Sequence, residues 1–415
     1  MTTAMGAALR RIQLGNALSA FGNGFTVPFL FVYVAQVRGL GAGTAGVVLS
    51  AFAVAALAVL PFTGRTIDRS GPLPVLLTGA FAAAVGSMGF GLASSAPLVV
   101  AASAVMGAGI AVMQPALATL IVWCSTPKTR SRAFATQFFL SNLGLGVGGL
   151  LGGLLVDTSR PDSFTLLFSI EAAMFLVLGV VAASVRLPKA ARMEAAPTDK
   201  AAGGWRALFA DRAMVHLCVL GGVLFFACYG QFESGLSAYA VEVTKVSPAT
   251  LGIALAANTA AIVVAQFLVL RPVERRRRSR VIAAVGLLWA LAWVVAGLAG
   301  LTGSAHGIAT AMLIGTYALF GLGEAMLSPT VAPLVADMAP ERMVGQYNSA
   351  FALVKQLALA VGPAVGGLMA GSGMYAEYIV MLVACSLAVS VLSVRLGRRL
   401  TVGQDAPLRE PVLAA

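Results

Sequence analysis

Residues 144–154, GLGVGGLLGGL, and residues 358–368, ALAVGPAVGGL, carry the pattern that decides the fold of this chain. They are 214 residues apart, and the same offset aligns Met106–Leu154 with Phe320–Leu368 without a gap. In the first copy, the glycines and the proline that meet identical residues are Gly107, Gly109, Pro115, Gly148, Gly152 and Gly153. An ungapped match over two apolar segments and their connecting loop is hard to obtain by chance. We therefore infer two homologous halves with the same orientation.

Apolar segments like these recur along all 415 residues of the chain. Hydrophobic residues make up 59% of it and charged residues 11%, whereas a soluble globular protein carries about 25% charged residues. A bilayer core of about 30 Å is crossed by roughly 20 apolar residues in a helix, which satisfies its own backbone polar groups. We therefore expect an all-α membrane protein with twelve transmembrane helices in two six-helix bundles. The predicted spans are 10–37, 43–64, 73–95, 97–123, 132–156, 163–187, 212–239, 247–270, 279–301, 305–337, 343–371 and 374–396.

The formal net charge of +12 is distributed unevenly along the chain. Arginine and lysine fall mostly on alternate loops, and the loops between them hold only Arg38, Arg160 and Lys245. This bias is the positive-inside pattern, which places both termini in the cytoplasm. We therefore expect a multi-pass protein of the cell membrane, surrounded by membrane lipid, and we expect no binding to nucleic acid.

The repeat also predicts how the chain is divided. We expect an N-terminal six-helix bundle over residues 1–188 and a C-terminal six-helix bundle over residues 212–396. The polar stretch 189–211 is interpreted as a cytoplasmic linker, and residues 397–415 as a cytoplasmic tail. Parallel repeats of this kind are typical of carriers, which bind their substrate near the bilayer midplane between the halves. We expect the protein to act as a monomer.

The segment Gly64–Gly71, GRTIDRSG, follows the second predicted span. It resembles the G-x-x-x-D-R-x-G signature of the major facilitator superfamily, and the resemblance extends over nearly the whole chain. Glycine permits a tight turn, Asp68 can cap a helix end, and Arg69 can pair with a carboxylate. Pro72 and Leu73 stand where the family usually has two basic residues, so we expect a weaker or differently built latch. The resemblance implies a conformational latch made of Gly64, Asp68, Arg69 and Gly71.

The glycine-rich fifth span is similar to the antiporter motif of the twelve-span drug:proton antiporter branch of this family. Gly149 stands where a proline is usual, whereas the second copy keeps that proline as Pro363. Small residues at these spacings let helix backbones approach closely, and ordinary helix packing is the alternative explanation. Ser103 replaces an arginine that exporters of this branch usually carry in the fourth span, so proton coupling would depend on other residues. The helix-packing motif comprises Gly144, Gly148, Gly152, Gly153, Gly362, Pro363, Gly366 and Gly367.

Three shorter segments look like the cavity-lining segments of multidrug exporters: Gly22–Tyr33 (GNGFTVPFLFVY), Tyr229–Tyr239 (YGQFESGLSAY) and Gly323–Thr330 (GEAMLSPT). Aromatic and methionine-rich linings suit lipophilic ligands because they pack adaptably. Polar and aromatic side chains on these and neighbouring spans are candidates for substrate binding, and helix packing is the alternative role for each. The candidates are Asn23, Tyr33, Gln114, Gln137, Asn142, Tyr229, Gln231, Tyr239, Lys355 and Gln356.

Four ionisable residues fall at bilayer depth, where a charge is costly and indicates a functional site by default. Glu324 and Lys355 fall near the middle of their spans, Glu233 toward the outer part of the seventh span, and Glu171 about two turns from the outer end of the sixth. A carboxyl group that alternates between apolar and cation-bearing surroundings can bind a proton on one face and release it on the other. We interpret Glu324, Glu233 and Glu171 as proton-coupling residues. In the alternative interpretation, Glu324 and Lys355 form a neutralised structural pair, or Lys355 contacts an anionic substrate, and Glu171 snorkels to the interface.

The sequence lacks a G-x-x-x-x-G-K-[ST] phosphate loop, and it shows no metal-ligand spacing and no catalytic triad. We therefore expect no cofactor, no metal and no enzyme activity. The combined pattern predicts a secondary active transporter, namely a proton-coupled antiporter for the efflux of small lipophilic compounds, as in drug resistance. We expect it to work by rocker-switch alternating access. One alternative is a proton-coupled symporter that imports a sugar, an organic acid or another nutrient, and a further alternative is a membrane enzyme or lipid scramblase.

Overall fold

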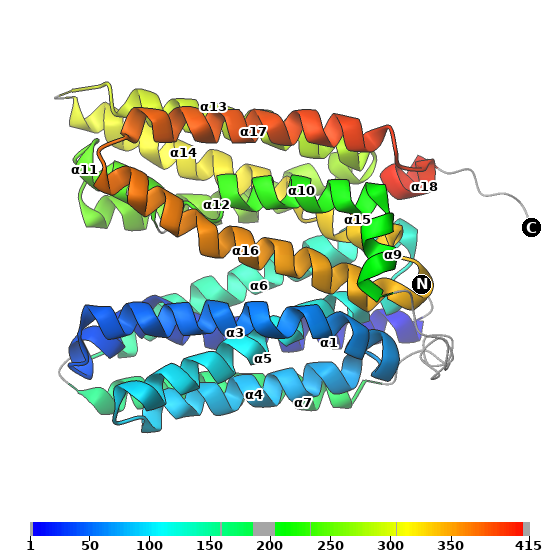
Figure 1. The fold of residues 1–415 in the computed structure, drawn as a ribbon, viewed down its shortest axis with the longest axis horizontal. Helices are drawn as coiled ribbons and strands as arrows, with labels where there is room; N and C mark the ends of the chain where they lie inside the picture. The colour runs from blue at the N-terminus through cyan, green and yellow to red at the C-terminus, as the bar shows by residue number, and fades with distance from the viewer. Residues whose placement is uncertain (1–2, 158–159, 186–203, 233, 304, 410–415) are drawn as a thin grey trace, which may run out of the picture. The chain divides into compact units, whose positions relative to one another are not determined.

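The computed structural model describes residues 3–157, 160–185, 204–232, 234–303 and 305–409 of the chain. Within these ranges every regular element is a helix (Figure 1). Eleven of the described helical segments are long and apolar enough to cross a membrane, or twelve if the bent pair α9–α10 counts as one span. The all-α membrane fold predicted from the apolar segments is therefore confirmed.

Contacts divide the chain into two compact units. Unit 1 consists of Met1–Ala207 and Ala339–Leu353. It contains α1 (Thr3–Thr26), which is continued by the short turns η1 (Val27–Phe29), α2 (Leu30–Val32) and η2 (Tyr33–Val37). Its other long helices are α3 (Gly41–Ser70), α4 (Pro72–Leu92), α5 (Ala96–Trp123), α6 (Pro127–Leu155) and α7 (Pro161–Ala183). The turn η3 (Glu341–Met343) and the start of α16 (Val344–Gly371) also belong to unit 1.

Unit 2 consists of Leu208–Met338 and Val354–Ala415. The short helix α9 (Gly204–Ala210) leads into it. Its helices are α10 (Arg212–Ala227), α11 (Gly235–Glu242), α12 (Pro248–Glu274), α13 (Arg278–Ala299), α14 (His306–Leu327), α15 (Val331–Met338), the rest of α16, and α17 (Tyr375–Gly397). The chain then forms α18 (Val402–Asp405) and the turn η4 (Pro407–Arg409).

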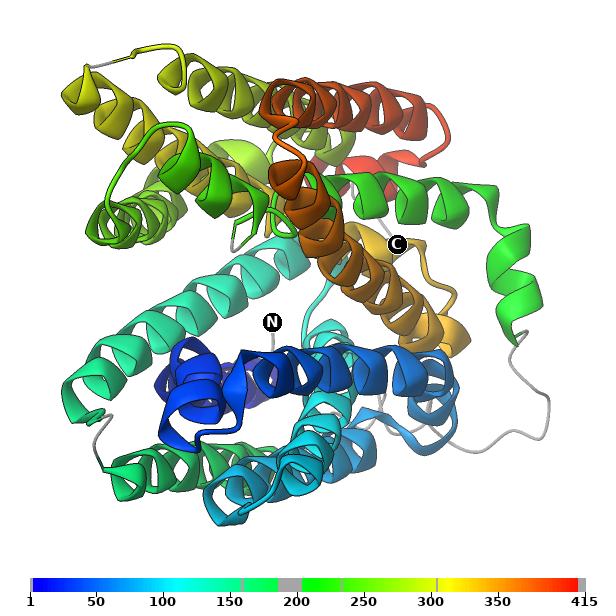
Figure 2. The ribbon, with the colours of Figure 1, turned by 60° about the vertical axis from the view of Figure 1, so that its left-hand side comes forward.

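In unit 1, α1 packs against α6 and α7, α4 packs against α5 and α7, and α3 packs against α5 (Figure 2). Glycine makes these crossings close. A Cβ atom on Gly86 of α4 would lie 2.5 Å from the backbone nitrogen of Met106 on α5. Since no side chain fits at that distance, the absence of a Cβ atom sets the α4–α5 separation.

In unit 2, α12 packs against α14, and α13 packs against both α14 and α17. Aromatic side chains fill the interior between these helices. Trp289 and Trp293 of α13 are fully buried, and both rings meet the ring of Phe320 edge to face. Such pairs stabilise packing by about 0.5–1.5 kcal/mol beyond the area they bury.

The predicted span 212–239 is wrong as a single helix, because α10 ends at Ala227 and the helix resumes only at Gly235 in α11. The break is tolerated because other groups satisfy the backbone carbonyls that it frees. The Gln231 side chain donates to the Phe226 carbonyl at 3.1 Å. The Trp293 indole donates to the Ala227 carbonyl at 2.9 Å.

The predicted span 305–337 is likewise interrupted, since α14 ends at Leu327 and α15 begins at Val331. Pro329 lies in this gap and has no N–H with which to continue the helical hydrogen bonds. The Thr330 backbone amide and hydroxyl donate to the Leu327 carbonyl at 2.9 Å and 2.8 Å. The regular helix is therefore interrupted at residues 328–330, and α14 and α15 together still form one candidate span.

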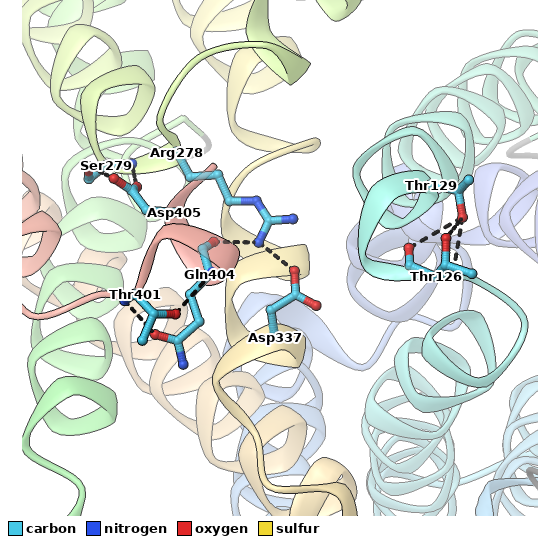
Figure 3. A network of polar contacts seen from close by, with 8 residues as sticks. All are labelled: Thr126, Thr129, Arg278, Ser279, Asp337, Thr401, Gln404 and Asp405. Atoms are coloured by element: carbon cyan, nitrogen blue, oxygen red, sulfur yellow. Dashed lines mark hydrogen bonds and ion pairs between the residues drawn. The ribbon is translucent and has the colours of Figure 1, made fainter. Parts of the chain in front are cut away.

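The short helix α18 is fixed to the ends of α13 and α15 by a polar network (Figure 3). Arg278 forms an ion pair with Asp337 at 2.6 Å and donates to the Gln404 carbonyl at 2.8 Å. Buried Asp405 accepts from the Ser279 backbone at 2.8 Å and from its hydroxyl at 3.0 Å. The first part of the predicted tail 397–415 is thus ordered against unit 2.

Parts of two predicted segments lie outside the described residues. These are residues 189–203 of the predicted linker 189–211 and residues 410–415 of the tail. The remainder of the linker contains α9. The boundaries of the two bundles and of the linker stay predictions.

Candidate functional site

Glu171 is the most completely buried charged residue that the sequence singled out. It lies at the midpoint of α7, and its side chain has an exposed fraction of 0%. The Thr26 hydroxyl, at the end of α1, donates to Oε1 at 2.7 Å. The Ser87 hydroxyl on α4 donates to Oε2 at 2.6 Å. The alternative interpretation, in which Glu171 snorkels to the interface, is therefore wrong, because three helices enclose it and two hydroxyl groups hold it inside unit 1.

The donors around Glu171 are fewer than the acceptors. Ser87 carries one hydroxyl hydrogen, yet its oxygen lies 2.6 Å from Glu171 Oε2 and 2.9 Å from the Phe168 carbonyl oxygen. A single hydrogen cannot serve both acceptors well. A proton on the Glu171 carboxyl group would supply the missing donor.

Glu324 occupies a comparable place in unit 2. It lies near the middle of the segment formed by α14 and α15, and 4% of its side chain is exposed. The Asn258 amide on α12 donates to Oε1 at 2.9 Å, and its other hydrogen can serve the Tyr317 carbonyl at 3.2 Å. Tyr229 lies within electrostatic range of the Glu324 carboxyl group. A neutral amide donor from α12 therefore holds Glu324.

Lys355 lies near Glu324 without contacting it directly. Its ammonium group stands over two rings, 5.4 Å from the centroid of Phe225 and 5.9 Å from that of Tyr229. Lys355 and Glu324 interact electrostatically, but no ion pair joins them in the described part of unit 2. The predicted neutralised pair is therefore a longer-range interaction, and Tyr229 lies near both groups.

Glu233, the third predicted proton-coupling residue, lies outside the described residues. Its place in the break between α10 and α11 follows from the sequence alone. The structure describes its neighbours, including Phe232, whose ring stacks on that of Tyr317 with centroids 5.5 Å apart.

Two candidate substrate-binding residues are polar and exposed within long apolar helices. Gln114 of α5 follows exposed Val105 by nine residues, and Lys355 of α16 precedes exposed Ala364 by nine residues. Nine residues turn an α-helix by about 180° relative to the starting direction. Each polar side chain thus points away from the apolar, lipid-compatible face of its own helix. Because polar groups are costly in lipid, this direction favours each side chain within its own unit.

Five other candidates are half-buried: Asn23, Gln137, Asn142, Tyr229 and Gln356. Asn142 donates to the Phe138 carbonyl of its own helix at 2.9 Å. Gln137 donates to the Ser141 hydroxyl at 3.1 Å. The side-chain oxygens of Asn23 and Gln137 are buried and have no hydrogen-bond partner among the described residues. Such acceptors can bind a donor from a ligand or from water.

The remaining candidates are buried and hydrogen-bonded within their units. The Tyr33 hydroxyl donates to the Phe90 carbonyl at 2.7 Å, and that of Tyr239 donates to the Gly297 carbonyl at 3.1 Å. Gln231 is fully buried and accepts from the Tyr378 hydroxyl at 3.0 Å. These three side chains stabilise helix packing in the structure.

The predicted latch residues lie where α3 meets the start of α16 in unit 1. Asp68 accepts from the backbone amides of Gly345 at 2.7 Å and Gln346 at 3.0 Å, and from the Gln346 side chain at 3.0 Å. It therefore caps the N-terminus of α16, where a negative charge is favourable. A Cβ atom on Gly64 would lie 2.6 Å from the Gln346 Cα atom. Gly71 has a φ of 83°, which favours glycine, and it separates α3 from α4.

The predicted helix-packing motif divides into tight and open positions. Gly144, Gly148 and Gly152 follow one another at intervals of four, so they share a face of α6 and pack against the backbone of α1. In unit 2, Gly362 meets Gly230, and Gly366 packs against the backbone of Gly235. The next residue in each copy has more room: Gly153 has only ordinary contacts and Gly367 has none within 4 Å. Pro363 is exposed.

Sequence reasoning missed the residues that hold the buried carboxyl groups, namely Thr26, Ser87 and Asn258. Thr26 lies within the quoted segment Gly22–Tyr33, but nothing in its spacing indicated a partner on α7. Ser103, which replaces the expected arginine, is fully buried and donates to the Val48 carbonyl of α3 at 2.6 Å. It has a packing role in unit 1.

Comparisons with known proteins agree with this architecture. The model of the Major Facilitator Superfamily matches residues 12–299 and 236–412. The uncharacterized MFS-type transporter YdeE of Escherichia coli (strain K12) is 25% identical over 412 residues, which cover 97% of this chain and 100% of the relative. Multidrug resistance protein MdtH of Salmonella arizonae is 24% identical over 356 residues, which cover 86% of this chain and 83% of MdtH.

A solved structure shows the same fold. The fucose:proton symporter FucP of Escherichia coli superimposes with a TM-score of 0.77 at 13% identity, covering 95% of this chain and 99% of FucP. At this identity the likeness shows the fold alone. The match of the family model over most of the chain decides the assignment: this chain belongs to the Major Facilitator Superfamily of membrane transporters.

Proposed function

We propose that this transporter couples the export of small lipophilic compounds to the movement of protons. The observation that carries the proposal is that each unit holds a buried carboxyl group at mid-span, Glu171 in unit 1 and Glu324 in unit 2. Neutral hydroxyl and amide groups donate to them. A carboxyl group in such a setting gains or loses a proton when its surroundings change between apolar and hydrated.

Glu171 is the better placed of the two to hold a proton in the described conformation. The Ser87 hydroxyl has one hydrogen for two acceptors, Glu171 and the Phe168 carbonyl. A proton on the Glu171 carboxyl group supplies the missing donor. If α1, α4 and α7 shift so that water reaches Glu171, the proton can leave and the carboxylate can be hydrated. The proton affinity of Glu171 then depends on whether the conformation of unit 1 lets water reach it.

Glu324 supplies a link to the substrate. A charged Glu324 is compensated in part by Lys355, which lies near it and over the Tyr229 ring. A substrate that enters beside Lys355 and Tyr229 changes this compensation, and with it the free energy of protonating Glu324. Coupling of this kind requires that substrate and proton affect each other's binding reciprocally.

The proposed substrate surface combines polar and aromatic groups. In unit 2, Lys355 points away from the apolar face of α16, and Tyr229 and Gln356 are half-exposed near it. In unit 1, Gln114 points away from the apolar face of α5. Aromatic side chains around Tyr229, such as Phe225 and Phe232, offer adaptable apolar contact. The similarity to MdtH, a multidrug resistance protein, supports the same class of ligand.

In this proposal the protein is a monomer of the cell membrane with both termini in the cytoplasm, as the positive-inside pattern predicts. Bundles 1–188 and 212–396 rock to expose the substrate alternately to the two sides. Asp68 acts as the latch, because its bonds to Gly345 and Gln346 form or break with the position of α16. Gly64 and Gly71 provide the close approach and the turn, and exposed Arg69 flanks the carboxylate.

The test of export uses inverted membrane vesicles that contain the wild-type protein. A proton gradient is imposed, and the accumulation of a fluorescent lipophilic dye is followed with and without an uncoupler. We expect accumulation that collapses when the uncoupler is added. Vesicles without the protein provide the background, and accumulation that persists after the gradient is removed would contradict proton coupling.

The same fold also serves import, since FucP is a fucose:proton symporter. The vesicle experiment therefore needs a second arm with right-side-out vesicles and radiolabelled sugars and organic acids. Proton-driven uptake of one of these solutes, with no movement of dye in the first arm, would replace the export proposal by the symport alternative.

A further inference from the structure

A cavity of about 340 Å³ opens on unit 2 where α9, α10 and α17 meet. Its lining consists of Phe209, Arg212, Val215, His216, Val219, Leu392 and Arg399. None of these residues is assigned to the substrate surface or to proton coupling. Apolar side chains and two arginines thus share one groove.

The lining follows a helical stripe. On α10, Arg212, Val215 and Val219 are spaced by three and four residues, so they lie on one face. Leu392 lies on α17, and Arg399 lies in the turn that follows its end at Gly397. Arg212 and Val219 are seven residues apart on α10, a rise of about 10 Å, so the groove is apolar along α10 and basic at one end.

The basic end carries more positive charge than the two arginines of the lining. Arg395 and Arg398 follow on the same end of α17 and are exposed. A guanidinium nitrogen of Arg399 donates to the Arg212 carbonyl at 3.5 Å, which holds its positive charge beside α10. The carboxylate of Asp211, next to Arg212, caps α10 by accepting from the amides of Ala213 and Met214.

His216 adds a polar group to the wall of the groove. Its Nε2 atom is buried and has no hydrogen-bond partner among the described residues. It lies within electrostatic range of Arg395 and Arg399. Beside it, α9 bends away from α10 by 86°, and its exposed Phe209 is part of the lining. When α10 spans the bilayer, α9 is oriented along the membrane interface, as interfacial helices are.

We propose that this groove binds one anionic phospholipid, with the phosphate between Arg212 and Arg399 and an acyl chain along Val215, Val219 and Leu392. Charge complementarity selects this occupant, because the groove joins a net positive end to an apolar channel parallel to a spanning helix. Basic pockets between helices at the cytoplasmic surface recognise anionic lipid headgroups in this way. His216 can bind an oxygen of the headgroup or of its glycerol ester.

The test is native mass spectrometry of the full-length protein in detergent, mixed with phosphatidylglycerol and phosphatidylethanolamine of identical chains. The variant R212Q/R399Q removes the two charges, and Val219→Trp blocks the apolar channel without changing charge. The matched control R276Q/R277Q removes two exposed arginines between α12 and α13. Inorganic phosphate and glycerophosphoglycerol are added separately to distinguish a lipid from a free phosphate.

We expect the wild-type protein to retain phosphatidylglycerol over phosphatidylethanolamine and the control to do the same. The R212Q/R399Q variant should lose about tenfold or more of this preference, and Val219→Trp should lower phosphatidylglycerol retention with both arginines in place. If R212Q/R399Q does not fold, Val219→Trp decides alone. Equal retention by wild type and variants, or an equal loss in the control, would overturn the proposal. Displacement by inorganic phosphate or glycerophosphoglycerol as effective as that by phosphatidylglycerol would also overturn it.

Discussion

Replacing Asp68 by alanine removes the cap of α16. In the structure the two carboxylate oxygens accept from the backbone amides of Gly345 and Gln346 and from the Gln346 side chain, at 2.7–3.0 Å. A hydrogen bond to a charged group contributes about 1.5–3 kcal/mol net. A charge at a helix N-terminus adds about 0.3–1 kcal/mol. Because Asp68 is only half-buried, water can replace part of these contacts. We therefore expect the three hydrogen bonds and the helix-terminus charge together to contribute about 2–3 kcal/mol.

That free energy corresponds to a roughly 30- to 160-fold change in a two-state equilibrium, at about 1.4 kcal/mol per factor of ten. The assay is hydrogen–deuterium exchange of the purified protein, followed on peptides from the first two turns of α16. In Asp68→Ala the amides of Gly345 and Gln346 have lost their acceptors, so we expect both to exchange faster by about this factor. Asp68→Asn keeps one acceptor oxygen and should show a smaller increase.

Arg69→Ala is the control, because Arg69 is exposed and adjacent to Asp68. It should leave the exchange of these two amides unchanged. Unaltered exchange in Asp68→Ala would refute the capping argument. An equal increase in Arg69→Ala would show that general disturbance of the α3 end, and not the loss of the cap, is responsible.

Two further substitutions test packing. Gly148→Leu should lower the thermal unfolding temperature, because any Cβ atom there overlaps the Phe21 carbonyl, whereas Gly367→Ala, with open space around it, should leave the temperature within a degree or two. Arg278→Gln should lower the unfolding temperature by several degrees, since removing one partner of a buried ion pair costs about 3–5 kcal/mol; exposed Arg280→Gln is the matched control. Thermal melts of the detergent-solubilised protein measure both pairs, and equal temperatures within either pair would contradict the stated role.

The elements predicted correctly are those that depend on composition over long windows. Apolar segments of more than 20 residues dictate spanning helices whatever their neighbours are. The motif also indicated that Asp68 can cap a helix end, although α3 continues through Gly64–Ser70 and the turn comes only at Gly71. What the motif did not contain was the partner, the first turn of α16, which is 277 residues away along the chain.

The breaks in the helices depend on tertiary partners, and sequence windows do not show these. The interruption after Ala227 is stable because Trp293, 66 residues away, satisfies its carbonyl. The surroundings of Glu171 could not be predicted for the same reason. Its depth in α7 left snorkelling open as an alternative, whereas its environment comes from Thr26 and Ser87, 145 and 84 residues away.

The central claim is that Glu171 and Glu324 couple transport to protons. It is tested most directly by proton-driven dye accumulation in inverted vesicles that contain Glu171→Gln, Glu324→Gln or the matched control Glu377→Gln. Glutamine keeps the shape and the acceptor oxygen but cannot exchange a proton at any pH in the range used. Glu377 is exposed at the start of α17, so its variant should match the wild type at equal expression.

We predict that each of the two buried variants loses accumulation driven by the proton gradient while still binding dye, as measured by quenching of tryptophan fluorescence. Full gradient-driven accumulation in both buried variants would contradict the account, and coupling would then have to be sought at Glu233.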